Sequence, residues 1–408
     1  MNKLIWEIKK GSYRAYQSIM KIALRVIPYP KQKVLTGSGC ILEIPAVLKE
    51  EKIEKILLVC SKSVRRRGML DGLIEGLEKE NIAYVIFEDI QPNPTTQNVE
   101  KGYQTYINHK CQGIVAIGGG SPLDCAKIIG VKVGNPTITY EAMKHMSAIK
   151  KPMPFFIAVP TTAGTGSEST VASVITNANN HSKYPVISMF LMPSCAVLDE
   201  TLTLGLPKDI TAYTGMDALT HAVEAYIGRF GTAYTNEEAL KAIKMIFENL
   251  EEAYLHGENV IIRKNMLIAS NHAANAFTRA YTGYVHTVSH ALSAIYNVGH
   301  GKTNAIILPH MLKYYGKSIE NKLAEIAIYT GLGKAEEEQA LLAQKVIDKI
   351  QRMNENMNIP SKVEELKEKD IQVVVSKALK EGNPDNPVPK IMNYEEMERV
   401  VRGLMNEK

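Results

Sequence analysis

Short apolar runs alternate with helical patterns along the first half of the chain. Four runs bounded by glycine, proline or polar residues are typical of buried strands, at residues 55–60, 83–90, 113–120 and 154–160. Apolar residues at helical spacing lie between them, near 65–80, 97–110 and 122–131. Strand–helix–strand alternation predicts a mostly parallel sheet, which binds ligands at the carboxyl ends of its strands.

The strand pattern stops after residues 202–207 (LTLGLP), and helical patterns fill the remainder of the chain. We expect helices near 209–228, 234–255, 258–280, 284–296, 303–315, 318–330, 335–355, 362–380 and 394–406. A chain of 408 residues is long enough for two hydrophobic cores. The pattern therefore predicts an amphipathic extension at 1–30, an α/β domain at 31–205 and a helical domain at 206–408.

Residues 1–30 mix apolar residues at helical spacing with lysine and arginine. Charges interrupt every apolar stretch, so this segment is not a signal peptide. One alternative is a helix that docks on its own protein or on a partner subunit. The other is a helix on an anionic membrane surface. We favour the first alternative and expect no membrane association.

Composition and charge exclude several classes of protein. A net charge of +5 without a basic run interleaved with aromatic residues argues against a nucleic-acid partner. No apolar run approaches the ~18 residues needed to span a bilayer. The five cysteines are scattered and form no CxxC pair, which favours a reducing, cytoplasmic location without disulfides.

The segment GIVAIGGGSPLDCAK (113–127) predicts a phosphate site. Gly118, Gly119 and Gly120 follow a predicted strand, and Ser121-Pro122 opens a predicted helix. Glycines let the backbone approach a ligand closely, and the first N–H groups of the helix favour an anion such as a pyrophosphate. The alternative is a tight turn without a ligand.

Two further loops follow predicted strands and fall at the same edge of the sheet. The segment PTTAGTGSEST (160–170) is rich in small hydroxyl residues, and QPNPT (91–95) follows the strand at 83–90. The first would contribute phosphate or nicotinamide contacts, and the second would border an adenine. Otherwise the first is simply a flexible polar loop.

Histidines gather between residues 283 and 310. His286 and His290 lie four residues apart, as do Asp217 and His221 upstream, so each pair shares one face of a predicted helix. His300 follows a Val-Gly break and would approach the same point from a loop. One carboxylate and three imidazoles suit a divalent transition metal. The alternative is a set of histidines that only satisfy core hydrogen bonds.

Five motifs, in this order, resemble the iron-containing (group III) alcohol dehydrogenase family. They are GGGSPLDCAK (118–127), PTTAGTGSE (160–168), LMPSCAVLDETLTLGLP (191–207), GMDALTHAVEAY (215–226) and HTVSHALSAIYNVGHG (286–301). The resemblance implies a Rossmann-like α/β domain and an all-α domain, in the dehydroquinate synthase-like arrangement, with the active site in the cleft between them. It also implies reversible hydride transfer between NAD(P)(H) and a small primary alcohol or aldehyde, and we expect a homodimer.

The resemblance also implies roles for individual residues. Its metal ligands are Asp217, His221, His286 and His300, with Fe2+ as the metal and Zn2+ as an alternative. His290 becomes a proton-relay residue, or a hydrogen-bonding neighbour of the ligands. The residues implied for cofactor binding are Asn93, Gly119, Gly120, Ser121, Asp124, Thr161, Thr162, Thr165 and Lys183.

Three departures from the family pattern concern the cofactor and the substrate. Ser61 stands where NAD-preferring members often carry an acidic residue, and Arg65 to Arg67 add positive charge nearby, so we expect NADP(H), with NAD(H) as the alternative. Ala172 stands where some relatives have a cofactor-contacting asparagine. The segment around residues 279–294 leaves the size of the substrate open.

Two other function classes remain open from the sequence. The first is a polyol dehydrogenase, or a metal- and NAD-dependent cyclase, of the same fold. A cyclase acting on a phosphorylated substrate needs additional basic residues, and residues 283–310 offer only Lys302. The second is a non-catalytic metal-binding assembly protein anchored by residues 1–30, which ranks last because the cofactor loops are intact.

Overall fold

The computed structural model describes residues 3–178 and 183–406, which divide into two compact units. The α/β unit combines residues 29–206 with residues 257–271. The helical unit contains the N-terminal segment up to residue 28, residues 207–256 and the chain from residue 272 onward. The N-terminal helix thus groups with the helical unit, and helix α9 (Val260–Ala280) contributes to both units.

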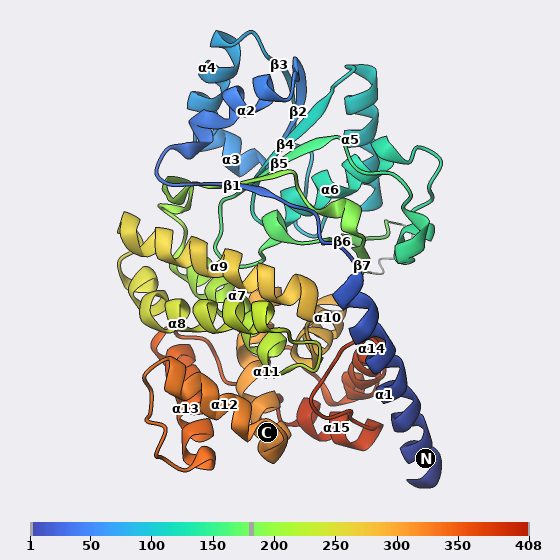
Figure 1. The fold of residues 1–408 in the computed structure, drawn as a ribbon, viewed down its shortest axis with the longest axis vertical. Coiled ribbons are helices and arrows are strands. Elements are labelled where there is room, and N and C mark those ends of the chain that lie inside the picture. Colours follow the sequence, from blue (N-terminus) through green and yellow to red (C-terminus); the bar gives the residue numbers. More distant parts are fainter. Residues whose placement is uncertain (1–2, 179–182, 407–408) are drawn as a thin grey trace. The chain divides into compact units, whose positions relative to one another are not determined.

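A six-stranded parallel sheet forms the centre of the α/β unit, with strand order β1-β8-β5-β4-β2-β3 (Figure 1). Its strands are β1 (Lys33–Thr36), β2 (Lys55–Cys60), β3 (Ala83–Phe87), β4 (Gly113–Gly118), β5 (Phe155–Pro160) and β8 (Cys195–Leu198). Strands β3 and β4 pair with opposite sides of β2, so the strand order reverses there. In parallel sheets, ligands bind in a crevice between the loops that follow the two strands at the point where the strand order reverses.

Both faces of the sheet are buried, which explains why its strands read as continuous apolar runs. Leu57 and Val59 of β2 pack with helices α5 (Thr96–Asn108) and α6 (Gly120–Gly134) in one core. The alternate residues of β2 pack with helices α2 (Ile44–Glu50) and α4 (Asp71–Lys79) in another. The unit is therefore a sandwich of helices, parallel sheet and helices.

The predicted strands and helices of this unit are present, with several differences. The helix expected near 65–80 is two helices, α3 (Lys62–Arg66) and α4, because the chain turns at Gly68 with a φ of +68°. The strand expected at 83–90 ends at Phe87. The pattern missed β1, β8 and the antiparallel hairpin of β6 (Ala172–Thr176) and β7 (Lys183–Ile187), since all four are short.

The helical unit consists of helices and their connections in the residues that the structure describes. Besides part of α9, its helices are α1 (Lys3–Val26), α7 (Lys208–Ile227), α8 (Ala233–Leu255), α10 (Tyr284–Tyr296), α11 (His300–Tyr315), α12 (Glu320–Tyr329), α13 (Gln339–Asn356), α14 (Ile371–Gly382) and α15 (Tyr394–Arg402). The helix expected near 362–380 starts only at Ile371. Across the described chain, no helix combines the length and the apolar character needed to cross a membrane.

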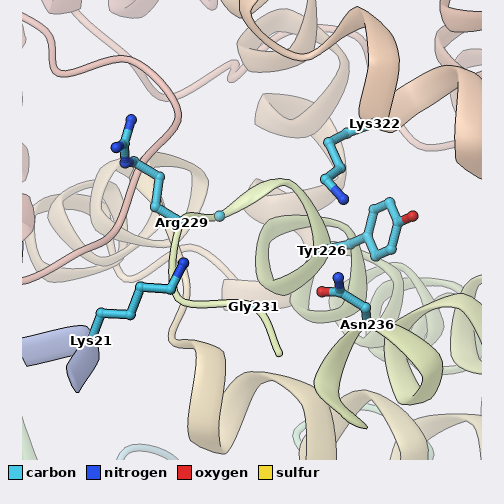
Figure 2. Close-up of a pocket in the computed structure, with 7 residues that line it drawn as sticks. Lys21, Tyr226, Arg229, Gly231, Asn236 and Lys322 are labelled. Atoms are coloured by element: carbon cyan, nitrogen blue, oxygen red, sulfur yellow. The ribbon is translucent and has the colours of Figure 1, made fainter. Parts of the chain in front are cut away.

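One pocket of the helical unit, of about 300 Å3, lies near three basic side chains, Lys21, Arg229 and Lys322 (Figure 2). Lys322 pairs with Glu325 at 3.0 Å and lies over the ring of Tyr226. Burial and the charges of neighbouring arginines lower the pKa of Lys21. The lining of this pocket includes none of the residues predicted to bind a metal or a cofactor.

Candidate metal centre and cofactor loops

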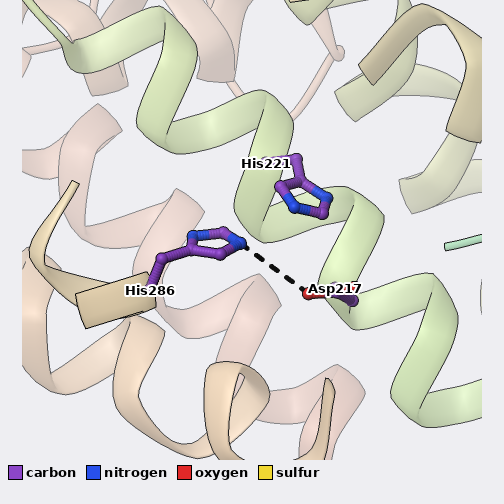
Figure 3. A group of neighbouring side chains, drawn as sticks. All are labelled: Asp217, His221 and His286. Atoms are coloured by element: carbon purple, nitrogen blue, oxygen red, sulfur yellow. Dashed lines mark ion pairs between the residues drawn. The ribbon is translucent and has the colours of Figure 1, made fainter. Parts of the chain in front are cut away.

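Helices α7 and α10 bring three predicted metal ligands together (Figure 3). Asp217 and His221 lie one turn apart on α7, and His286 lies in the first turn of α10. One donor atom from each residue lies within 4.8 Å of the other two, and all three side chains are buried. A buried carboxylate and two imidazoles at this spacing form a donor set suited to a divalent cation.

Glu224 orients the ring of His286. Its Oε2 atom lies 2.6 Å from His286 Nδ1, and the carboxylate also accepts the backbone N–H groups of Gly283 and Val285 at the start of α10. An Nδ1 proton donated to the carboxylate leaves Nε2 as a lone-pair donor, a pattern common in metal-binding histidines. Burial alone would lower the pKa of His286, but Glu224 and Asp217 raise it above its usual value.

His286 Nε2 provides the test of whether these residues fit a metal ion. The atom is buried, and within the described residues it has no hydrogen-bond partner. Asp217 Oδ1 lies 3.8 Å from it. A buried nitrogen without a partner is costly unless something fills the position. The donor set therefore fits a cation.

His221 and Asp217 are also held by their surroundings. The His221 ring stacks between Phe277, at 4.0 Å between centroids, and His286, at 4.5 Å. Asp217 Oδ1 accepts a hydrogen bond from Asn304 Nδ2 at 2.6 Å. Packing and hydrogen bonding thus fix both side chains before any ligand arrives, which keeps the ordering cost of binding low.

His300 lies beside this group but is not one of its three members. It is the first residue of α11, so the expectation that it approaches from a loop was wrong. Its Nε2 atom lies 3.6 Å from Asp217 Oδ1 and 3.1 Å from Asn304 Nδ2. Ser289 Oγ lies 3.0 Å from its Nδ1 atom.

His290 is one turn beyond His286 on α10. Its ring stacks on His300 with 4.9 Å between centroids, and its Nδ1 atom lies 2.6 Å from Glu381 Oε1 on α14. Both His290 and Glu381 are partly exposed. His290 therefore lies between the buried group and solvent, with a carboxylate next to its ring.

In the α/β unit, the loop after β4 meets the loop after β5. Gly118 has a φ of +156°, which an L side chain rarely adopts, and its carbonyl accepts the N–H of Thr161. A Cβ atom at Gly120 would lie 2.9 Å from Thr165, so glycine is needed for this close approach. A Cβ atom at Gly119 would meet Thr162 at 3.5 Å, which is an ordinary van der Waals contact.

The N-terminus of α6 points its backbone N–H groups into this loop region. Its N-cap residue, Gly119, has no side chain that could satisfy them. Nearby, Ser121 Oγ accepts the N–H of Asn93 at 3.4 Å, and Lys183 donates to Asn93 Oδ1 at 3.0 Å. Three residues predicted from separate motifs are thus neighbours at the carboxyl edge of the sheet.

Asp124 differs from the other predicted cofactor residues. Its Oδ1 atom accepts from Ser167 Oγ at 2.7 Å, and Oδ2 accepts from the N–H of Val174 at 2.9 Å. Both carboxylate oxygens are therefore engaged with the chain itself. Burial raises the pKa of Asp124, and the charge of Lys127 opposes that effect.

Lys127 is a fully buried cation beneath the same loops. Its Nζ donates to the carbonyls of Thr170 and Ala172, both at 2.8 Å, and to Thr170 Oγ1 at 2.9 Å. Burial lowers its pKa to about 8, and burial raises the pKa of Glu168 to about 7. Lys127 thereby ties helix α6 to the segment that follows β5.

Ser61 begins helix α3 directly after β2, and its side chain accepts the N–H of Val64. It therefore lies at the strand reversal, next to the glycine loop that follows the neighbouring strand β4. Among the arginines that follow, Arg65 pairs with Glu88 at 3.2 Å.

Several residues around the metal group were missed by the sequence argument. Glu224 and Asn304 contact the predicted ligands, and Ser289 and Glu381 contact the rings of His300 and His290. Two signals were present: Glu224 lies three residues after His221, and Asn304 lies four after His300, each on the same helical face.

Comparison with known proteins agrees with the motifs. The family described as iron-containing alcohol dehydrogenase matches residues 30–200, and the C-terminal part of the Fe-containing alcohol dehydrogenase family matches residues 211–405. The chain is 37% identical to the 1,3-propanediol dehydrogenase of Citrobacter freundii over 353 residues, covering 86% of this chain and 91% of that protein. It is 30% identical to the NAD-dependent methanol dehydrogenase of Bacillus methanolicus, covering 90% and 97%.

A solved structure shows the same fold. The crystal structure of a 1,3-propanediol oxidoreductase superposes with a TM-score of 0.88 and 34% identity, covering 92% of this chain and 99% of that one. The Rossmann-like parallel sheet and the all-α C-terminal part predicted from the sequence are confirmed. This chain belongs to the iron-containing alcohol dehydrogenase family and is an NAD(P)-dependent, metal-dependent alcohol oxidoreductase.

Proposed function

We propose that the enzyme interconverts small primary alcohols and aldehydes with NADP(H), at iron(II) held by Asp217, His221, His286 and His300. The observation that carries this proposal is the buried group of Asp217, His221 and His286, in which Glu224 directs the His286 lone pair toward the other two. His300 is the proposed fourth ligand because its Nε2 atom lies 3.6 Å from Asp217 Oδ1.

Iron(II) is proposed from the family, and zinc is the alternative, since nitrogen and oxygen donors accept either ion. When bound, the metal supplies a Lewis acid that lowers the pKa of an alcohol and polarises an aldehyde. The protein contributes the orientation of the ligands. Glu224 holds the proton on His286 Nδ1, and Asn304 fixes Asp217 by a 2.6 Å hydrogen bond.

A proton must leave or reach the substrate oxygen, and we assign this transfer to His290. The residue lies beside His300 and contacts the carboxylate of Glu381, which is partly exposed. A histidine in contact with such a carboxylate can pass a proton between a buried site and solvent.

The cofactor proposal uses the loops at the carboxyl edge of the sheet. Gly119, Gly120 and Ser121, with the N-terminus of α6, would bind the pyrophosphate, because free N–H groups there favour an anion. The proposed contacts along the rest of the cofactor are Thr161, Thr162, Thr165, Asn93 and Lys183. When bound in these loops, the cofactor would supply or accept the hydride at its nicotinamide ring.

Asp124 has a different proposed role. Because its two carboxylate oxygens accept from Ser167 and Val174, it is proposed to position the loop after β5 against α6. The contacts that Asp124 makes therefore support an indirect contribution to cofactor binding.

NADP(H) is preferred in this proposal because Ser61 carries no charge at the strand reversal. A carboxylate there would bind the ribose hydroxyls and repel a 2′-phosphate. Arg65 is partly neutralised by Glu88, which leaves Arg66 and Arg67 as the cations for the 2′-phosphate. One relative is named as NAD-dependent, so NAD(H) is the alternative.

The substrate proposal is a short primary alcohol or a terminal diol, and the relatives named for methanol and 1,3-propanediol support it. The test uses metal-stripped protein reconstituted without oxygen with iron(II) or zinc, then given a short aldehyde. We expect the oxidation to depend on the metal, and we expect NADPH to be oxidised faster than NADH. Faster oxidation of NADH would contradict the cofactor preference, and turnover without metal would contradict the proposed mechanism.

A further inference from the structure

Helix α1 exposes its apolar side. Six of its large apolar side chains are between 55% and 76% exposed, and we call them the outer stripe: Leu4, Ile5, Ile8, Ile19, Ile22 and Val26. Most of these residues are separated by three or four positions, or by a whole number of helical turns. They therefore share one side of the helix. Glycine, serine and alanine at positions 11, 12 and 15 continue this side without a charge.

The opposite side of α1 docks on the helical unit and carries polar residues together with Leu24, which is buried and lies seven residues after Gln17. Arg14 donates to the carbonyls of Val388 and Pro389, both at 2.8 Å. Gln17, which is buried, donates to the carbonyls of Pro384 and Asn386 at 2.9 and 2.8 Å. These bonds to four backbone carbonyls fix the rotation of α1 about its axis, so the outer stripe is held facing away from residues 384–389.

The exposure of the outer stripe is unusual for a surface helix. A surface helix normally packs its apolar side on the protein and turns its polar side to water. Large contiguous apolar patches on a protein surface mark sites of interaction with another molecule or a membrane. The matched family region begins only at residue 30, so α1 lies outside the part of the chain that resembles catalytic relatives.

Charge indicates what covers the outer stripe. Helix α1 contains six basic residues, Lys3, Lys9, Lys10, Arg14, Lys21 and Arg25, and one acidic residue, Glu7. Its net charge of +5 equals that of the whole chain, so the rest of the chain is neutral overall. A second copy of α1 would bring like charges together, whereas an anionic surface would be attracted.

Because α1 docks through one side and exposes the other, we propose, against the expectation from the sequence, that it also binds the surface of an anionic lipid bilayer, with the outer stripe in the boundary between headgroups and acyl chains. Arg14 is engaged with the helical unit and Lys10 pairs with Glu7, whereas Lys9 and Arg25 are exposed at the two margins of the outer stripe. A helix with an apolar side flanked by such cations lies in the plane of an anionic surface. Its basic residues add roughly 1 kcal/mol each when near anionic headgroups. The bonds of Arg14 and Gln17 transmit this attachment to the helical unit.

The test is flotation of the full-length enzyme with vesicles of phosphatidylcholine, alone or with phosphatidylglycerol. We expect flotation only with the anionic vesicles, and less flotation as salt rises. Ile19→Glu should lower the partition coefficient roughly tenfold or more, because an apolar contact is lost. The matched control is Ile261→Glu on α9, where the isoleucine is 71% exposed against 68% for Ile19, and it should float like the wild type.

Other outcomes would overturn the proposal. Equal flotation with neutral and anionic vesicles would show that the positive charge of α1 does not contribute to binding, which contradicts the proposal. If the wild type does not float but forms a dimer, and this dimer dissociates in Ile19→Glu, then a second copy of the chain covers the outer stripe. The activity of Ile19→Glu in solution should equal that of the wild type. Equal activity would show that the variant is folded, so that a loss of flotation reports on membrane binding and not on the proposed function.

Discussion

His286 Nδ1 and Glu224 Oε2 lie 2.6 Å apart, and the same carboxylate accepts the N–H groups of Gly283 and Val285. One buried carboxylate therefore orients a proposed metal ligand and also fixes the first turn of the helix that carries it. A metal site built this way depends on a residue that is not itself a proposed ligand.

The Glu224→Gln variant tests this dependence. The amide keeps the shape of the side chain but removes its charge and presents an N–H group to His286, so we expect metal affinity to fall roughly 10- to 100-fold. The measurement is competition with a chelator of known affinity. The control is Glu325→Gln, which removes the charge of the carboxylate that accepts from the Tyr226 hydroxyl. Tyr226 lies on the same helix as Glu224, and this variant should retain full affinity.

Replacing His290 should separate proton transfer from metal binding. We expect His290→Ala to lower kcat roughly a hundredfold or more while metal content stays at the wild-type level, because general acid–base residues contribute on that scale. Glu381→Gln should have a smaller effect of the same kind, since it acts through its contact with the His290 ring. Loss of metal from His290→Ala would show instead that this residue is a ligand.

A carboxylate introduced at residue 61 should reverse the cofactor preference. In Ser61→Asp, repulsion of the 2′-phosphate should raise the KM for NADPH at least about tenfold and lower the KM for NADH. Steady-state kinetics with both cofactors measure this. The control is Ser318→Asp, which introduces the same charge at an exposed serine of the helical unit and should leave the ratio unchanged. Equal effects of the two variants would argue against a specific role for Ser61.

Lys127→Met should destabilise the α/β unit. The substitution leaves three buried acceptors of Thr170 and Ala172 without their donor, which costs about 2–4 kcal/mol. For a unit of this size the unfolding midpoint should fall by roughly 5–10 °C, measured by calorimetry. An unchanged midpoint would mean that the buried charge costs as much as its hydrogen bonds contribute.

The same variant should change the dependence of stability on pH. Because the folded-state pKa of Lys127 is about 8 against an ordinary 10.5, the unfolded chain binds more protons between these values. Stability of the wild type should therefore rise from pH 8 to 10.5, and the difference from Lys127→Met should widen in that window. Glu168, with a pKa of about 7 against 4.5, should lower stability as pH rises from 4.5 to 7 in both proteins.

Much of the α/β unit could be predicted because its central strands are fully buried. Strands β2, β4 and β5 read as unbroken apolar runs, since both faces of the sheet are covered. Strand β1 has only four residues, none of them fully buried, so no pattern marks it. The break between α3 and α4 depends on the turn at Gly68, which helical spacing of apolar residues cannot reveal.

The candidate site was predictable where its residues repeat at helical spacing. Asp217 and His221 on α7 were recognised from their separation of four residues, and the structure brings His286 beside them. Glu224 shares a helical face with His221, but its contact with His286, 62 residues further along the chain, exists only in the folded protein. Likewise, the contact of Asp124 with the backbone of Val174 exists only in the folded chain.

The most direct test of the account compares the wild type with His286→Ala after anaerobic reconstitution with iron(II). Bound metal and the rate of NADPH oxidation with a short aldehyde would be measured on the same samples. We expect about one metal ion per chain and metal-dependent turnover in the wild type, and the loss of both in the variant. If His286→Ala retains both its metal and its turnover, the proposed metal centre is wrong.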